Sequence, residues 1–153
     1  MTDTSHSSPT YLDCADSVAV RMQDTLLLIG RIMIGWIFLT AGWGKVTNVS
    51  GFAAGMPKMG LPEFMGDVAA YGEFLGGILL IVGLASRYAA ALLVIFTLSA
   101  TFLAHRYWEY PPEAQGAQSG QFWKNIAITG GFLAYFVTGA GRYSLDAILK
   151  RKA

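Results

Sequence analysis

The chain has 153 residues, of which 54% are hydrophobic and only 14% are charged, and its formal net charge is +1. Soluble domains carry about 25% charged residues, so this composition predicts a membrane protein. A nearly neutral chain offers no basic face, and we therefore expect no nucleic-acid partner.

Residues 1–23 are predicted to form a polar, partly disordered N-terminal tail. Its first residues, "MTDTSHSSPTYLDCADS", contain three aspartates and no lysine or arginine. A signal peptide begins with basic residues, so this pattern indicates a retained tail. Cys14, which lies in it, is the only cysteine of the chain and cannot form an internal disulfide or a thiolate metal site.

Four apolar segments follow, each close to the roughly 20 residues that a helix needs to cross a membrane. They predict an all-α integral membrane bundle of four transmembrane helices within residues 24–146, followed by a basic C-terminal tail over 147–153. The four predicted helices cover residues 24–43, 66–85, 88–105 and 122–140.

The connections between the segments predict two helical hairpins. The second and third segments are joined only by "ASRY", whereas long loops rich in glycine and proline follow the first and the third. More basic residues lie on the side of the short connection, and those on the side of the long loops are interspersed with acidic residues. The positive-inside rule then places both termini in the cytoplasm and the long loops outside the cell membrane.

Arg31 lies within the first apolar segment, where an unpaired charge costs about 2.5–3.5 kcal/mol on insertion scales. Helical spacing predicts that two faces with small residues meet, because small residues let helix backbones approach closely. We expect Glu73 to form a structural ion pair with Arg31, while Lys45 and Lys124 compete for the same carboxylate. The two faces are Arg31, Gly35, Phe38, Gly42 and Lys45, and Glu73, Gly76, Gly77, Leu80, Leu84 and Arg87, the second beside the Gly72-x-x-x-Gly76 packing motif.

Polar side chains of three segments are predicted to converge in the outer half of the membrane, with tryptophans nearby. Headgroup contacts would explain each of them singly, but together they resemble a site with proton-active groups, hydrogen-bond donors and aromatic walls. A quinone headgroup suits such a site. Glu73 and His105 are the candidates for proton transfer, and the candidate quinone-binding residues are Lys45, Lys124, Asn125, Trp43 and Trp123.

Other chemistry finds little support in the sequence. "GWGK" lacks both the spacing of a phosphate-binding P-loop and the strand that precedes one. His6 and His105 are the only histidines, and only His105 borders an apolar segment. We expect neither a metal ion nor a haem.

The order of these features resembles the DoxX family of small four-helix membrane proteins, over roughly residues 26–146. The matching pieces are "IGRIMIGWIFLTAGWGK", "YGEFLGGILLIVGLASR", "FWKNIAITGGFLAY" and "GAGRYSLD". The resemblance implies a cytoplasmic-membrane protein linked to redox and sulfur metabolism, in a family that includes the quinone-reactive membrane subunit of thiosulfate:quinone oxidoreductase. Its motifs contain the residues selected by polarity: Arg31, Lys45, Glu73, Arg87, His105, Lys124 and Asn125.

Two functions are therefore expected from different classes. The first is the membrane subunit of a quinone-linked redox system, acting with a partner redox subunit, with the oxidation of sulfur compounds as one variant. The alternative is a non-enzymatic membrane scaffold that recruits redox partner proteins through its long outer loops and basic tail. Lipid contact is expected in both, and homo-oligomerisation is compatible with both; a transporter would be unusually small.

Overall fold

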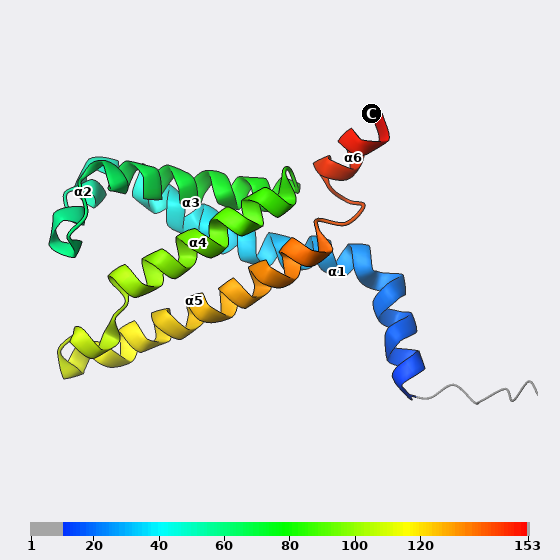
Figure 1. The fold of residues 1–153 in the computed structure, drawn as a ribbon, viewed down its shortest axis with the longest axis horizontal. Helices are drawn as coiled ribbons and strands as arrows, with labels where there is room; N and C mark the ends of the chain where they lie inside the picture. The colour runs from blue at the N-terminus through cyan, green and yellow to red at the C-terminus, as the bar shows by residue number, and fades with distance from the viewer. Residues whose placement is uncertain (1–10, 153) are drawn as a thin grey trace, which may run out of the picture.

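The computed structural model describes residues 11–152, and these residues form helices joined by turns and contain no strand (Figure 1). The all-α prediction is confirmed. In chain order the elements are α1 (Tyr11–Val46), α2 (Val49–Ala53), the 3₁₀ helix η1 (Met56–Met59), α3 (Phe64–Val82), α4 (Ser86–Ala104), the 3₁₀ helix η2 (Tyr107–Glu109), α5 (Pro112–Thr138) and α6 (Leu145–Lys152).

The long helices are arranged as two hairpins, as predicted. α1 packs along α3, and α4 packs along α5, while α3 and α4 meet over a shorter stretch. The long connections contain α2 with η1 in the first hairpin and η2 in the second. In Figure 1 the hairpins come together toward the α3–α4 turn and diverge toward α2 and η2.

Three of the described helical segments are long and apolar enough to cross a membrane: 13–46, 64–82 and 86–109. The fourth predicted span lies in α5, which is long enough but is not among these candidates; Lys124 and Asn125 lie near the start of that span and lower its hydropathy. α5 nevertheless packs against α4 along the bundle. The chain is a multi-pass membrane bundle, and the crossing by α5 remains a prediction.

The helix ends differ from those expected from hydropathy. α1 begins at Tyr11, well inside the predicted tail, and Asp13 in its first turn favours a helix start. α5 begins at Pro112, and proline suits the first turn of a helix because its φ angle is already helical. Most of the predicted C-terminal tail is the helix α6. Residues 1–10 of the predicted tail and residue 153 lie outside the described part of the chain.

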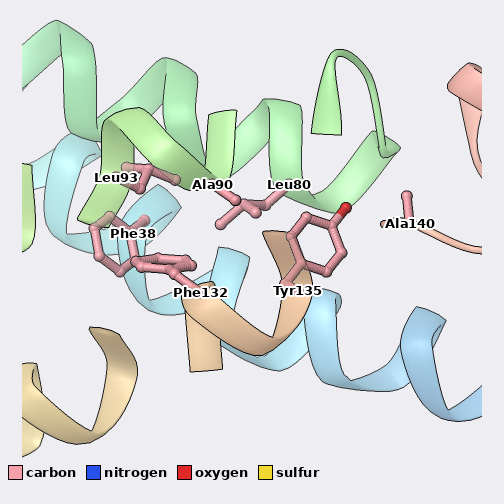
Figure 2. Packing of buried hydrophobic residues seen from close by; sticks show 7 residues of the cluster. All are labelled: Phe38, Leu80, Ala90, Leu93, Phe132, Tyr135 and Ala140. Atoms are coloured by element: carbon pink, nitrogen blue, oxygen red, sulfur yellow. The ribbon is translucent and has the colours of Figure 1, made fainter. Parts of the chain in front are cut away.

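All four long helices contribute to one apolar core (Figure 2). The rings of Phe38 from α1 and Phe132 from α5 meet edge to face, with their centroids 5.2 Å apart. Large apolar side chains also cover the outside, and Tyr88 and Val137 are 79% and 70% exposed. An apolar surface of this kind is what lipid contact requires. The core residues are Phe38, Leu80, Ala90, Leu93, Phe132, Tyr135 and Ala140.

Glycines bring α1 and α3 into close contact. A Cβ atom at Gly42 would lie 2.6 Å from the Cα atom of Phe74, and one at Gly77 would lie 2.9 Å from the carbonyl oxygen of Gly35. The prediction that these two faces meet is confirmed along α3, but Arg87, which was placed on the same face, lies in α4 and binds α5, because α3 ends at Val82. Gly72 of the predicted packing motif has open space beside it, whereas a Cβ at Gly76 would meet Leu93 of α4. The close approach to α1 therefore uses Gly77 and not Gly72.

Candidate functional site

Arg31 is buried, with 4% of its surface exposed, and its guanidinium group binds the segment that links α5 to α6. Nη1 donates a hydrogen bond of 2.9 Å to the carbonyl oxygen of Ala140, and Nη2 donates one to the carbonyl oxygen of Tyr143. Hydrogen bonds to a charged group contribute about 1.5–3 kcal/mol each. Arg31 therefore anchors the C-terminal part of the chain to α1.

The predicted ion pair between Arg31 and Glu73 is wrong. Glu73 accepts its hydrogen bond from Lys45, at the opposite end of the bundle from the Arg31 contacts. α1 and α3 run antiparallel, so the end of α1 lies beside the start of α3, and Arg31 lies beside the end of α3 at Gly83. Lys45, one of the predicted competitors, is the partner because it is level with the carboxylate.

Gly83 makes room for the arginine. It ends α3 with a φ angle of +68°, a left-handed conformation that glycine adopts without strain. A Cβ atom at this position would overlap Nη1 of Arg31 and would lie 2.6 Å from Cβ of Ser144. The α3–α4 turn thus serves two purposes, since it reverses the chain and leaves space for Arg31.

Two aspartates that the sequence analysis did not select hold the same C-terminal segment. Asp24 on α1 accepts a hydrogen bond of 2.8 Å from the amide of Arg142. Asp146 accepts bonds of 2.8 Å from the amides of Ala85 and Ser86, and so caps the start of α4. The sequence shows Asp146 a few residues after "GAG", but the amides that it binds, at Ala85 and Ser86, lie about 60 residues away.

The carboxyl group of Asp146 is held in its ionised form. Partial burial acts to raise its pKa, but hydrogen bonds from Ser86 and Ala85 and the charge of Lys150 outweigh that effect. The net result is a pKa below the usual value for aspartate. An ionised carboxylate at a helix N-terminus is favoured by the helix dipole.

Glu73 and Lys45 form an ion pair between α3 and α1 at the other end of the bundle. The side chain of Glu73 is 11% exposed and that of Lys45 is 31% exposed. The ammonium group of Lys45 also lies 5.3 Å from the centre of the Phe52 ring, within the range of a cation–π contact. Glu73 therefore fixes a charged donor at the place where α1, α2 and α3 meet.

A cavity of about 290 Å³ opens beside this ion pair, between the two hairpins. Its two ionisable lining residues are Lys45, from α1, and His105, at the end of α4. The remaining lining is almost wholly apolar, with three methionines from the connection between α1 and α3 and from the start of α3. The other lining residues are Phe52, Met56, Met59, Leu61, Met65, Ala69, Phe96, Ser99, Ala100, Leu103 and Ala104.

His105 is oriented by α5. Its Nδ1 atom lies 2.8 Å from the side-chain oxygen of Gln118. An amide oxygen can only accept, so Nδ1 carries the hydrogen in this assignment and Nε2 remains able to accept a proton. The histidine is therefore held in one tautomer at the wall of the cavity.

Comparison with known proteins places the chain in a family. The DoxX family model matches residues 26–106, and the SURF4 family model matches residues 68–152. The chain is 39% identical to the inner membrane protein YqjF of Escherichia coli K12, over 86% of this chain and 98% of that protein. The chain belongs to the DoxX family.

Two further relatives of this DoxX-family protein are named as an inner membrane protein and as a putative oxidoreductase. The inner membrane protein YphA of E. coli K12 is 35% identical over 79% of this chain and 88% of its own length. A Bacillus subtilis 168 protein named "Putative oxidoreductase CatD" is 33% identical over 56% of this chain and 69% of its own length. No solved structure matches significantly.

The remaining predicted site residues of the DoxX-family protein lie outside the cavity lining. Trp43 packs against Phe74, and Trp123 contacts Phe122; both tryptophans are more than half exposed. Lys124 is exposed and donates a hydrogen bond to Gln121. Asn125 does not line the cavity either. The structure thus brings together Lys45, Glu73 and His105 from the predicted set.

Proposed function

We propose that this DoxX-family protein is the membrane subunit of a quinone-linked redox system, with a quinone headgroup bound in the cavity between the hairpins. The observation that carries the proposal is one apolar cavity with a fixed ammonium group at one wall and a histidine at another. The name of the B. subtilis relative, an oxidoreductase, agrees with this class of function.

The cavity has the chemistry that a quinone requires. Its volume of about 290 Å³ lies just below the usual range for ligand pockets, about 300–1,000 Å³, and suits a small headgroup. Methionine side chains are flexible and polarisable, and they adapt to an aromatic or isoprenoid surface. A quinone bound there would supply a two-electron, two-proton acceptor, with the electrons delivered by a partner redox subunit.

Lys45 would bind one quinone oxygen. Its ammonium group has three hydrogens to donate, and the ion pair with Glu73 leaves donors available. Glu73 is nearly buried, and its contact with Lys45 holds the ammonium group at the cavity wall. The carboxylate is then a positioning residue whose own contact is with Lys45.

His105 would deliver protons. Its Nδ1–H is engaged with Gln118, so Nε2 is the atom that takes up and releases a proton. A histidine changes charge near neutral pH and so suits this role. His105 also lies at the end of α4, directly before the connection that carries η2.

The scaffold alternative explains the ion pair differently. Lys45 and Glu73 also join α1 to α3, and a purely structural pair would require no ligand. In that case Glu73→Gln would lower the melting temperature without changing the quinone content. Measuring both the melting temperature and the quinone content of the variants therefore distinguishes the two functions.

The proposal predicts that quinone co-purifies with the native protein and is lost from a Lys45→Gln variant. Removing a charged hydrogen-bond donor costs about 1.5–3 kcal/mol, which corresponds to roughly 10- to 100-fold weaker binding. The measurement is quinone per protein by mass spectrometry of lipid extracts, after gentle purification from native membranes. Lys124→Gln is the matched control, because Lys124 lies outside the cavity, and it should retain quinone.

A second variant avoids disturbing the ion pair. Ala100 lines the cavity from α4, and its side chain is only a methyl group. Ala100→Phe therefore fills the cavity and leaves Lys45 and Glu73 unchanged. It should lose quinone while keeping its melting temperature close to that of the native protein. Quinone retained by both Lys45→Gln and Ala100→Phe, or absent from the native protein, would favour the scaffold.

A further inference from the structure

A second cavity, of about 300 Å³, lies at the opposite end of the bundle, where α4 begins and α5 ends. Its lining includes two basic side chains, Arg87 from the start of α4 and Lys150 from α6. This end of the bundle is also where Arg31 and Asp146 fix the segment between α5 and α6. The walls of the cavity are therefore held in place by polar contacts, of which the Arg31 bond is buried.

Arg87 is oriented toward the end of α5. Its Nη1 atom donates a hydrogen bond of 2.9 Å to the carbonyl oxygen of Phe136. A Cβ atom at Gly139 would lie 3.8 Å from Nη2 and 3.9 Å from Nε, so these two donors lie beside a position without a side chain. One guanidinium nitrogen thus fixes the side chain, and two more lie beside open space at the cavity wall.

An acidic residue in the lining, Asp146, offsets only part of the positive charge. Both of its oxygens accept hydrogen bonds from amides at the start of α4, where the helix dipole also stabilises a carboxylate, and its charge interacts with Lys150. Arg87 is a second cation in the lining, and Arg151 and Lys152 follow in α6. The electrostatic character of this region favours an anion.

An exposed apolar stripe leads from this cavity along α4. Tyr88, Leu92 and Ile95 are 79%, 67% and 64% exposed, and their spacing places them on one face of the helix. α4 is among the helices apolar enough to cross a membrane, and its first residues lie at the cavity. A ligand with a charged head in the cavity and apolar chains along the stripe matches both features.

α6 supports the same arrangement. Leu145, Ile148 and Leu149 are exposed, while its last turn is basic. A helix with exposed apolar side chains and basic residues is suited to the interface between headgroups and acyl chains. Basic pockets at the ends of transmembrane helices bind anionic lipid headgroups.

We propose that the cavity lined by Arg87 and Lys150 binds the phosphate of an anionic glycerophospholipid, whose acyl chains lie along Tyr88, Leu92 and Ile95. This lipid site is separate from the quinone cavity and does not depend on it. Arg87 and Lys150 bind the phosphate oxygens, and Gly139, which has no side chain, leaves space for the phosphate.

The test uses the full-length protein in detergent, mixed with equal amounts of phosphatidylglycerol and phosphatidylcholine with the same acyl chains. Native mass spectrometry then measures the lipid that remains bound. Each basic residue near a membrane surface contributes about fivefold to the binding of anionic lipid. With two such residues we expect about 25-fold preference for phosphatidylglycerol, reduced to about fivefold in Lys150→Gln and nearly lost in Arg87→Gln/Lys150→Gln.

Lys58→Gln is the control, because Lys58 is an exposed lysine in η1, at the other end of the bundle. It should keep the full preference. Lys150→Gln alone removes an exposed side chain and serves as the test if the double variant fails to fold. Equal retention of the two lipids, an equal loss in Lys58→Gln, or displacement of the lipid by millimolar inorganic phosphate would overturn the proposal, the last by indicating a site for free anions.

Discussion

Replacing Arg31 by methionine is expected to lower the free energy of unfolding by about 3–6 kcal/mol, because two hydrogen bonds from a charged donor, each contributing about 1.5–3 kcal/mol, are lost. The guanidinium group holds the carbonyl oxygens of Ala140 and Tyr143, which would lose a charged donor. The segment between α5 and α6 would then detach from α1. Thermal unfolding in detergent and limited proteolysis between residues 138 and 146 measure the two effects.

Arg21→Met is the matched control for this change. Arg21 lies on the same helix but is exposed, and surface substitutions change stability by only about 0.5 kcal/mol. Its melting temperature and proteolysis pattern should resemble those of the native protein. Equal behaviour of the two variants would show that Arg31 does not anchor the C-terminal segment.

Gly42→Ala is expected to lower the free energy of unfolding by about 3 kcal/mol, at the upper end of the cost of overpacking. The new Cβ atom would meet the backbone of Phe74, at 2.6 Å from its Cα atom, and a backbone cannot move aside as a side chain can. α1 and α3 would have to separate. The same displacement would lengthen the Lys45–Glu73 contact nearby. Thermal unfolding in detergent measures the loss.

Gly44→Ala is a control for which we expect no loss of stability. Gly44 is also in α1, and no atom lies within 4 Å of the position of its added Cβ. Alanine is favoured over glycine inside a helix by about 0.5–1 kcal/mol, so this variant should be as stable as the native protein or slightly more stable. If both alanines destabilised the protein equally, close packing at Gly42 would not be the cause.

Much of the fold follows from sequence patterns that act locally. Apolar segments of sufficient length and the short link "ASRY" predict the hairpins, and the spacing of Gly35, Gly42 and Gly77 predicts the faces that meet. The partner of Arg31 was not predictable in the same way. Its acceptors are backbone carbonyl groups more than 100 residues away, and a carbonyl group has no signature in the sequence.

The depth of the candidate site residues in the membrane was predictable from the sequence, but the direction in which each side chain points was not. Counting about 1.5 Å per residue places Lys45, Glu73, His105 and Lys124 in the same half of the bundle. The direction of each side chain depends on packing between helices. Phe122 is buried against Phe102 and the rings of η2, which leaves the neighbouring Trp123 and Lys124 on the exposed face of α5.

The methionine-lined wall of the cavity was missed for another reason. Met56, Met59 and Met65 lie in or next to the connection rich in glycine and proline, which has no helical periodicity to show its apolar side. The short helices α2 and η1 fold this connection back over the end of the bundle. Apolar residues inside such a loop were the only available signal.

The most direct test of the proposed quinone site is labelling with a photoreactive quinone analogue in native membranes, followed by peptide mass spectrometry. Labels are expected within residues 52–65 and 99–105, which contribute to the cavity lining, and unlabelled quinone should compete with them. Lys45→Gln should reduce the labelling, and Lys124→Gln should not. Labels that concentrate on residues 122–125 of α5, or that are insensitive to Lys45→Gln, would contradict a quinone site between the hairpins.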